Sequence, residues 1–132
     1  MLVLERVLAG DVRALDDLGV LAPEVLLSAK GRRRAVLDRA GVRRALLDFD
    51  AGLASAADLQ AWASFVRRGW LPAWRYPSPS LDIDYELDRE DEIVEIIGRL
   101  DEIGDLIDGD PPSHEEVAAM LATLDDEASA RH

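Results

Sequence analysis

Residues 93–107 read IVEIIGRLDEIGDLI, and this stretch decides the fold class. Apolar side chains recur in it at intervals of three and four, at positions 93, 96, 97, 100, 103, 106 and 107. An α-helix places residues with this spacing on one face, which must then be buried against other elements. We therefore predict a core helix over residues 93–107, ended by the Gly-Asp-Pro-Pro sequence at 109–112.

The segments around this stretch also predict helices. Ser113 and Glu116 have the spacing of a capping box that opens a last helix, whose apolar face would comprise Val117, Met120, Leu121 and Leu124. Ser55 and Asp58 form a similar box before a helix over residues 56–69, after a stop at Gly52. This helix would bury Leu59, Trp62, Ala63 and Val66 and leave Gln60, Arg67 and Arg68 to water.

The N-terminal half is less regular. Helical spacing at positions 4, 7 and 8, and again at 12, 15 and 18, predicts either two short helices or one helix kinked at Gly10-Asp11. Asp11 is a candidate cap for the second piece. A further short helix is predicted from about 25 to 30, and a longer one from 32 to 50. Three prolines in residues 70–80 exclude a continuous helix there, so we interpret this stretch as a linker.

Residues 81–87 alternate apolar and acidic side chains, which is typical of a half-buried extended segment. Since one strand cannot stand alone, this segment would pair with an unrecognised partner strand, add to another protein or lie extended over the helices, and we favour the last. Neither side of the linker has enough long helices to bury its apolar faces alone. The sequence therefore predicts a single all-α domain over residues 1–132, a compact bundle of about five or six helices with one extended acidic segment.

The charge is divided unevenly along the chain. Residues 1–75 carry 12 basic and 9 acidic side chains, whereas residues 76–132 carry 3 and 18, and the net charge is −12. An acidic half repels nucleic acid and anionic membranes and attracts basic partners, although acidity also serves solubility alone. The absence of cysteine, of a signal-like N-terminus and of an apolar run of about 18 residues predicts a cytoplasmic protein with no membrane association. The preference for arginine over lysine indicates a GC-rich bacterial source.

The search for chemistry predicts no enzyme, cofactor or metal site. The two histidines, His114 and His132, stand near a helix start and at the last residue, where neither suits a general base. No glycines have a phosphate-binding spacing. The alternating acids from Asp82 resemble the start of a calcium loop, but Leu87 stands where that loop needs glycine and Ile93 where it needs a bidentate acid.

The sequence does offer candidate partner-binding residues. We define the acidic face as six carboxylates that follow the linker: Asp82, Asp84, Glu86, Asp88, Asp91 and Glu95. Linker aromatics are candidate anchors, because aromatic residues are enriched at binding hot spots: Trp70, Trp74 and Tyr76. These residues predict a non-enzymatic module that binds a basic protein. The alternative is a nucleic-acid-associated regulatory module that uses the basic segment Arg32–Arg44, although that segment also suits a contact with the acidic part of the same chain or of a second copy in a homodimer.

A family resemblance supports the first interpretation. Residues 51–63, AGLASAADLQAWA, resemble the glycine, capped turn and helix of small bacterial helical proteins, some of which share the layout of colicin-type immunity proteins. The helix from 92 to 108, the Asp-Pro-Pro-Ser turn at 110–113 and the closing helix to 124 are similar to that layout too. The resemblance covers residues 39–125, without the linker. It implies an acidic bundle that neutralises a basic nuclease toxin, with carboxylates after Ser80 mimicking phosphates.

Overall fold

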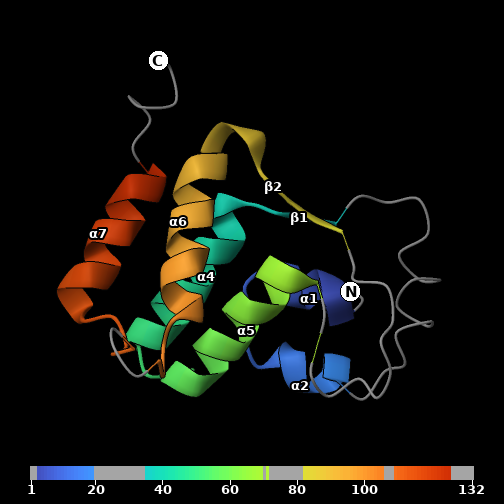
Figure 1. The fold of residues 1–132 in the computed structure, drawn as a ribbon, viewed down its shortest axis with the longest axis horizontal. Coiled ribbons are helices and arrows are strands. Elements are labelled where there is room, and N and C mark those ends of the chain that lie inside the picture. Colours follow the sequence, from blue (N-terminus) through green and yellow to red (C-terminus); the bar gives the residue numbers. More distant parts are fainter. Residues whose placement is uncertain (1–2, 20–34, 70, 72–81, 106–108, 126–132) are drawn as a thin grey trace.

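The computed structural model describes residues 3–19, 35–69, 71, 82–105 and 109–125. Within these residues it is mainly helical, with one small sheet, so the predicted all-α class is confirmed (Figure 1). The helices are α1 Val3–Leu8, α2 Ala14–Gly19, α4 Arg39–Asp50, α5 Ala56–Arg68, α6 Glu90–Asp101 and α7 His114–Asp125. The strands are β1 Ala35–Leu37 and β2 Ile83–Tyr85, and a 3₁₀ turn, η1 Leu87–Arg89, leads into α6.

Helix α6 lies between α5 and α7, while α4 contacts both α7 and α5 (Figure 1). One hydrophobic core draws on every one of these helices and extends from Leu4 to Leu124. Trp62 of α5 is fully buried in it, and its indole N–H donates a hydrogen bond of 2.8 Å to the carbonyl oxygen of Val7. This bond satisfies the polar atom of the buried ring and fastens α5 to α1.

The predicted limits of α5 are confirmed. The Ser55 hydroxyl accepts from the Asp58 N–H at 3.0 Å, and the Asp58 carboxylate accepts from the Ser55 N–H at 3.4 Å, which completes the capping box. At the other end Gly69 has φ +71°, the left-handed conformation that stops a helix. The two short N-terminal helices are present as α1 and α2. Asp11 was a candidate cap for α2, but its carboxylate accepts a hydrogen bond of 3.2 Å from the Arg6 guanidinium.

Helix α6 is shorter than predicted. It ends at Asp101, and Gly104 follows with φ +91° and an N–H bonded to the carbonyl oxygen of Gly109 at 2.7 Å. The apolar spacing continues past this end because Ile103, in the turn, still packs against the core. The apolar spacing shows which residues are buried. A turn that directs an apolar side chain back into the core keeps the same spacing as a helix. Residues 106–108 lie outside the described part.

The prediction of one helix over residues 32–50 was wrong in its first part. Residues 35–37 form strand β1, and α4 begins only at Arg39. Asp38 separates the two elements, because its carboxylate accepts a hydrogen bond of 2.9 Å from the Gly41 N–H and caps the helix.

The extended acidic segment is present, but the expectation that it lies unpaired was wrong. Strand β2 pairs in parallel with β1, with Ala35 opposite Ile83 and Leu37 opposite Tyr85. The Leu37 carbonyl then accepts from the Glu86 N–H at 2.9 Å. The predicted helix near 25–30 and the linker at 70–80, apart from buried Leu71, lie outside the described residues.

Candidate protein-binding face on helix α6

The acidic face is spread over three consecutive elements, β2, η1 and α6, and the residues beside them. Asp82 precedes β2, Asp84 lies within it, and Glu86 and Asp88 flank the start of η1. Asp91 and Glu95 are exposed on the first two turns of α6 and one helical turn apart. Negative side chains stabilise a helix at its N-terminus through the helix dipole, which explains why this sequence can begin a helix with so many carboxylates.

Two residues of the acidic face are used within the chain. A carboxylate oxygen of Glu86 accepts a hydrogen bond of 3.0 Å from the backbone N–H of Arg39, which holds η1 against the start of α4. Asp84 lies opposite Val36 in the sheet register and takes part in an interaction inside the protein. The Glu86 carboxylate therefore supports the fold.

The carboxylates from η1 into α6 have no ion pair with any described residue: Asp88, Glu90, Asp91, Glu92 and Glu95. Other acidic residues of the same half do have cationic partners. Asp101 pairs with Arg67 and Arg68, Glu116 with Arg99, and Asp125 with Arg43. Five carboxylates without an ion pair to a described residue are thus gathered in one short stretch, from η1 into the N-terminal half of α6.

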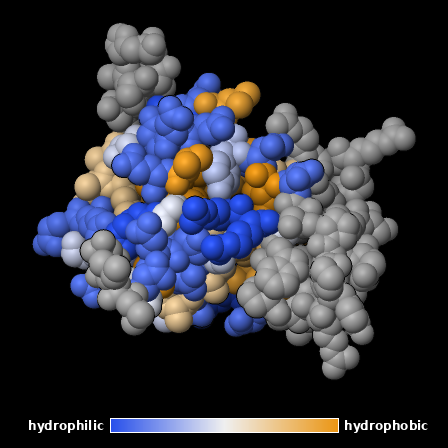
Figure 2. All heavy atoms as spheres, in the orientation of Figure 1, coloured by the Kyte–Doolittle hydropathy of each residue, from blue (hydrophilic) through white to orange (hydrophobic). Residues whose placement is uncertain are grey.

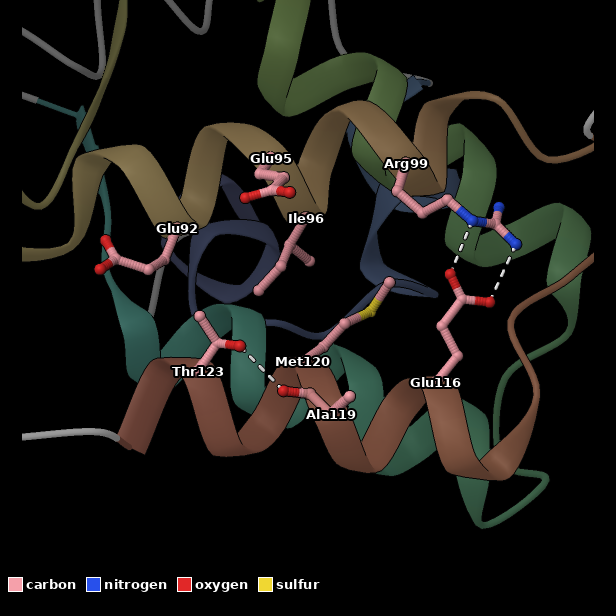
Figure 3. A pocket seen from close by; sticks show the side chains of 8 residues that line it. All are labelled: Glu92, Glu95, Ile96, Arg99, Glu116, Ala119, Met120 and Thr123. Atoms are coloured by element: carbon pink, nitrogen blue, oxygen red, sulfur yellow. Dashed lines mark hydrogen bonds and ion pairs between the residues drawn. The ribbon is translucent and has the colours of Figure 1, made fainter. Parts of the chain in front are cut away.

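A groove of about 310 Å³ runs between α6 and α7 beside these carboxylates (Figure 3). We call it the α6–α7 groove, and it is lined by Glu92, Glu95, Ile96, Arg99, Glu116, Ala119, Met120 and Thr123. Ile96 and Met120 are buried and form an apolar floor. The side chains of Glu92 and Glu95 lie toward one end, and Arg99 and Glu116 face each other at the opposite end (Figure 3).

Arg99 is held by a two-pronged ion pair. Its Nε–H donates to one Glu116 oxygen at 2.8 Å and its Nη2–H to the other at 3.1 Å. The same Nη2 donates to the Asp110 carbonyl at 2.8 Å. The Ser113 hydroxyl caps α7 as predicted, accepting from the Glu116 N–H at 3.1 Å, while the Glu116 carboxylate is committed to Arg99.

The surface beside these acids also exposes apolar side chains. Leu87 is 79% exposed and Val94 is 50% exposed. Figure 2 shows a mostly hydrophilic surface over α6 and α7, with small hydrophobic patches. The surface near α6 can therefore offer both charge and apolar contact to a partner.

A buried carboxylate was missed by the sequence interpretation. The Asp101 side chain is 4% exposed and accepts from Arg67 at 2.8 Å, from Arg68 at 3.3 Å and from Gln60 at 3.2 Å. Arg67 and Arg68 are exposed, as predicted, and Gln60 is half-buried, but all three side chains also reach Asp101 across the α5–α6 contact. Burial raises the pKa of the nearby Tyr85 phenol, an effect that Arg67 opposes and Asp101 adds to. The only sequence signal for this buried carboxylate was that Asp101 stands directly after Leu100, a residue of the apolar stripe.

His114 forms a contact rather than standing alone in water. Its Nδ1 lies 2.8 Å from a carboxylate oxygen of Asp50, which joins the start of α7 to the end of α4. The hydrogen bond and charge of Asp50 raise the pKa of the His114 imidazole, with a smaller contribution in the same direction from Glu115 and a small opposing effect of desolvation. The His114 side chain is 75% exposed.

Several of the other candidate residues fall outside the described part of the chain. Trp70, Trp74 and Tyr76 and the arginines at 32–34 lie outside the described residues. Arg43 pairs with Asp125, and Arg44 pairs with Asp48 at 3.6 Å. Arg43 thus makes an intramolecular contact between the basic segment and the acidic part, which is one of the contacts that the sequence suggested for this segment.

Among the described residues, no group of three or more histidine, aspartate or glutamate side chains could hold a metal ion, and no helix is long and apolar enough to cross a membrane. Comparison with protein-family models, curated proteins and solved structures finds no match for this chain.

Proposed function

We propose that this chain is a non-enzymatic protein-interaction module whose acidic face binds a basic protein. The resemblance to colicin-type immunity proteins suggests a specific form of this function, in which the partner is a basic nuclease toxin that the chain neutralises. The carboxylates near the start of α6 would then occupy the place of nucleic-acid phosphates in the toxin's site.

The observation that carries the proposal is the gathering of carboxylates between Asp88 and Glu95. Carboxylates that only keep a protein soluble are expected all over its surface, and neighbouring cations neutralise many of them. Here five carboxylates without an ion pair to a described residue lie between Asp88 and Glu95, and the one arginine among them, Arg89, is buried. Arginines of the neighbouring elements pair instead with Asp101, Glu116 and Asp125. Charges of one sign on adjacent turns sum to a local field that steers a basic protein during encounter.

The test is affinity capture from a lysate of the source organism at low and high salt. The variant Asp88→Asn/Asp91→Asn/Glu95→Gln removes three charges from the proposed site. The control Asp16→Asn/Asp105→Asn/Glu115→Gln removes the same number from exposed positions elsewhere. We expect a basic protein to be retained by the wild type and the control and lost by the first variant or in high salt. Equal retention by both variants would contradict the proposal.

A second measurement addresses the immunity form of the proposal. The captured protein is purified and assayed for nuclease activity with and without the chain. Inhibition at a one-to-one ratio, lost with the Asp88/Asp91/Glu95 variant, is the expected result. A captured partner without nuclease activity would contradict the immunity function, but the proposal that the chain binds a basic protein would stand.

A further inference from the structure

We infer that the α6–α7 groove receives an arginine side chain of the basic partner. This inference rests on the proposed function and narrows it, because it names the chemical group recognised and the place where it binds. Three features of the groove support it: the shape of the groove, the charge at its two ends and the position of Arg99.

The position of Arg99 is the first step. Glu95 and Arg99 are four residues apart on α6 in the order that favours an ion pair within a helix. Arg99 instead pairs with both oxygens of Glu116 on α7, and Figure 3 shows it turned away from Glu92 and Glu95. The cation that would ordinarily neutralise this end of the groove is thus engaged at the other end.

The lining of the groove fits the remaining parts of an arginine. Ile96 is 4% exposed and Met120 is 9% exposed, and they give the aliphatic stem an apolar floor. Glu92 and Glu95 offer carboxylates to the guanidinium, whose weak hydration and planar donors suit a partly buried pair. The Thr123 hydroxyl donates to the Ala119 carbonyl at 2.9 Å, so its oxygen lone pairs stay available to accept from the guanidinium.

The size of the groove selects a side chain over a larger ligand. A volume of about 310 Å³ is at the lower limit for pockets that enclose small molecules, roughly 300–1,000 Å³. A whole helix would not enter it. A single long side chain can, with the rest of the partner resting on the surrounding acidic surface.

The test uses a blocked tripeptide, acetyl-Ala-Arg-Ala-amide, titrated into the isotope-labelled protein and followed by NMR. Its neutral counterpart carries citrulline, which keeps the shape of arginine without the charge. We expect saturable shifts at the amides of Ile96, Met120 and Thr123, at least tenfold weaker with citrulline. Equal shifts with both peptides, or shifts confined to residues outside the groove, would overturn the inference.

A pair of variants separates the groove from the general charge of the surface. Ala119 is exposed and lines the groove, so Ala119→Leu fills the groove without changing any charge, whereas Ala122→Leu makes the same change at an exposed position outside the lining. We expect Ala119→Leu to weaken peptide binding and partner capture at least tenfold and Ala122→Leu to leave both unchanged. Capture that survives Ala119→Leu but is lost in the Asp88/Asp91/Glu95 variant would refute the groove inference and keep the proposed function.

Discussion

Asp101 shows how one buried charge can organise the side chains around it. Its carboxylate is buried while its partners Arg67 and Arg68 are 52% and 54% exposed, so water screens the cations but hardly reaches the anion. The cost of removing the carboxylate is therefore below that of breaking a fully buried ion pair, which is about 3–5 kcal/mol.

We predict that Asp101→Asn lowers the free energy of unfolding by about 1–3 kcal/mol, the range for lost charge-assisted hydrogen bonds. Urea denaturation measures this change. The matched control is Glu102→Gln, at the exposed next residue, which should change the stability by no more than about 0.5 kcal/mol. Equal effects of the two substitutions would show that the Asp101 contacts contribute nothing to stability.

Within residues 109–125, His114 is a residue whose charge depends on pH near neutrality. Its pKa is raised by Asp50. A pKa that is higher in the folded state contributes stability that is fully present below the ordinary value of 6.5 and is lost as the pH rises through the folded-state pKa. The contact between α4 and α7 should therefore weaken as the pH rises above the folded-state pKa of His114.

We predict that Asp50→Asn returns the His114 pKa toward its ordinary value and removes this part of the pH dependence. An NMR titration of the imidazole protons gives the pKa, with His114→Gln identifying the signal, and thermal unfolding across the same pH values gives the stability. An unchanged His114 pKa in Asp50→Asn would mean that the two side chains do not meet in solution.

At the scale of elements, two glycines inside helices have opposite roles. A Cβ at Gly41 of α4 would collide with the carbonyl oxygen of Leu8, so α1 and α4 approach each other there as only glycine allows. A Cβ at Gly98 of α6 would meet nothing within 4 Å, so this glycine only weakens its helix.

We predict opposite effects of the same substitution at these sites. Gly98→Ala should raise the free energy of unfolding by about 0.5–1 kcal/mol, the usual gain of alanine over glycine in a helix. Gly41→Ala should lower it, because α1 must move to make room. Chemical denaturation of both variants compares them directly, and a stabilising Gly41→Ala would contradict the close approach of the two helices.

The sequence predicted the helices well where local signals agreed. Ser55 and Gly69 limit α5 by their own chemistry, and no distant contact is needed. It could not predict the sheet, since three-residue strands carry too little periodicity and β1 and β2 are far apart in the chain. The early end of α6 was hidden because Ile103 keeps the helical spacing while lying in a turn.

The candidate site was predictable only in part. The sequence locates a run of acidic residues before and within α6, since charge is a property of composition. It does not indicate which carboxylates are neutralised, because Arg99 had a near partner in Glu95 and a distant one in Glu116. The α6–α7 groove depends on that choice and on the pairing of two helices, and neither can be read from spacing.

At the scale of the whole molecule, the sign of the charge is divided between its parts. The net charge of −12 comes from the second half of the sequence. Several arginines of the first half form ion pairs with acidic residues of the second half and hold it in place. The carboxylates of α6 without an ion pair to a described residue are directed outward. Interactions between exposed charges are screened beyond about 8 Å at physiological salt, so a partner guided by this surface should associate faster at low ionic strength.

The measurement that tests the central claim most directly is the association rate of the captured basic partner as a function of salt. It should be recorded for the wild type, the Asp88/Asp91/Glu95 variant and the charge-matched Asp16/Asp105/Glu115 control. Our account predicts a wild-type rate that falls steeply with salt, a slower and flatter rate for the α6 variant, and a control close to the wild type. Identical rates for the two variants at every salt concentration would contradict it, because net charge alone would then explain the binding.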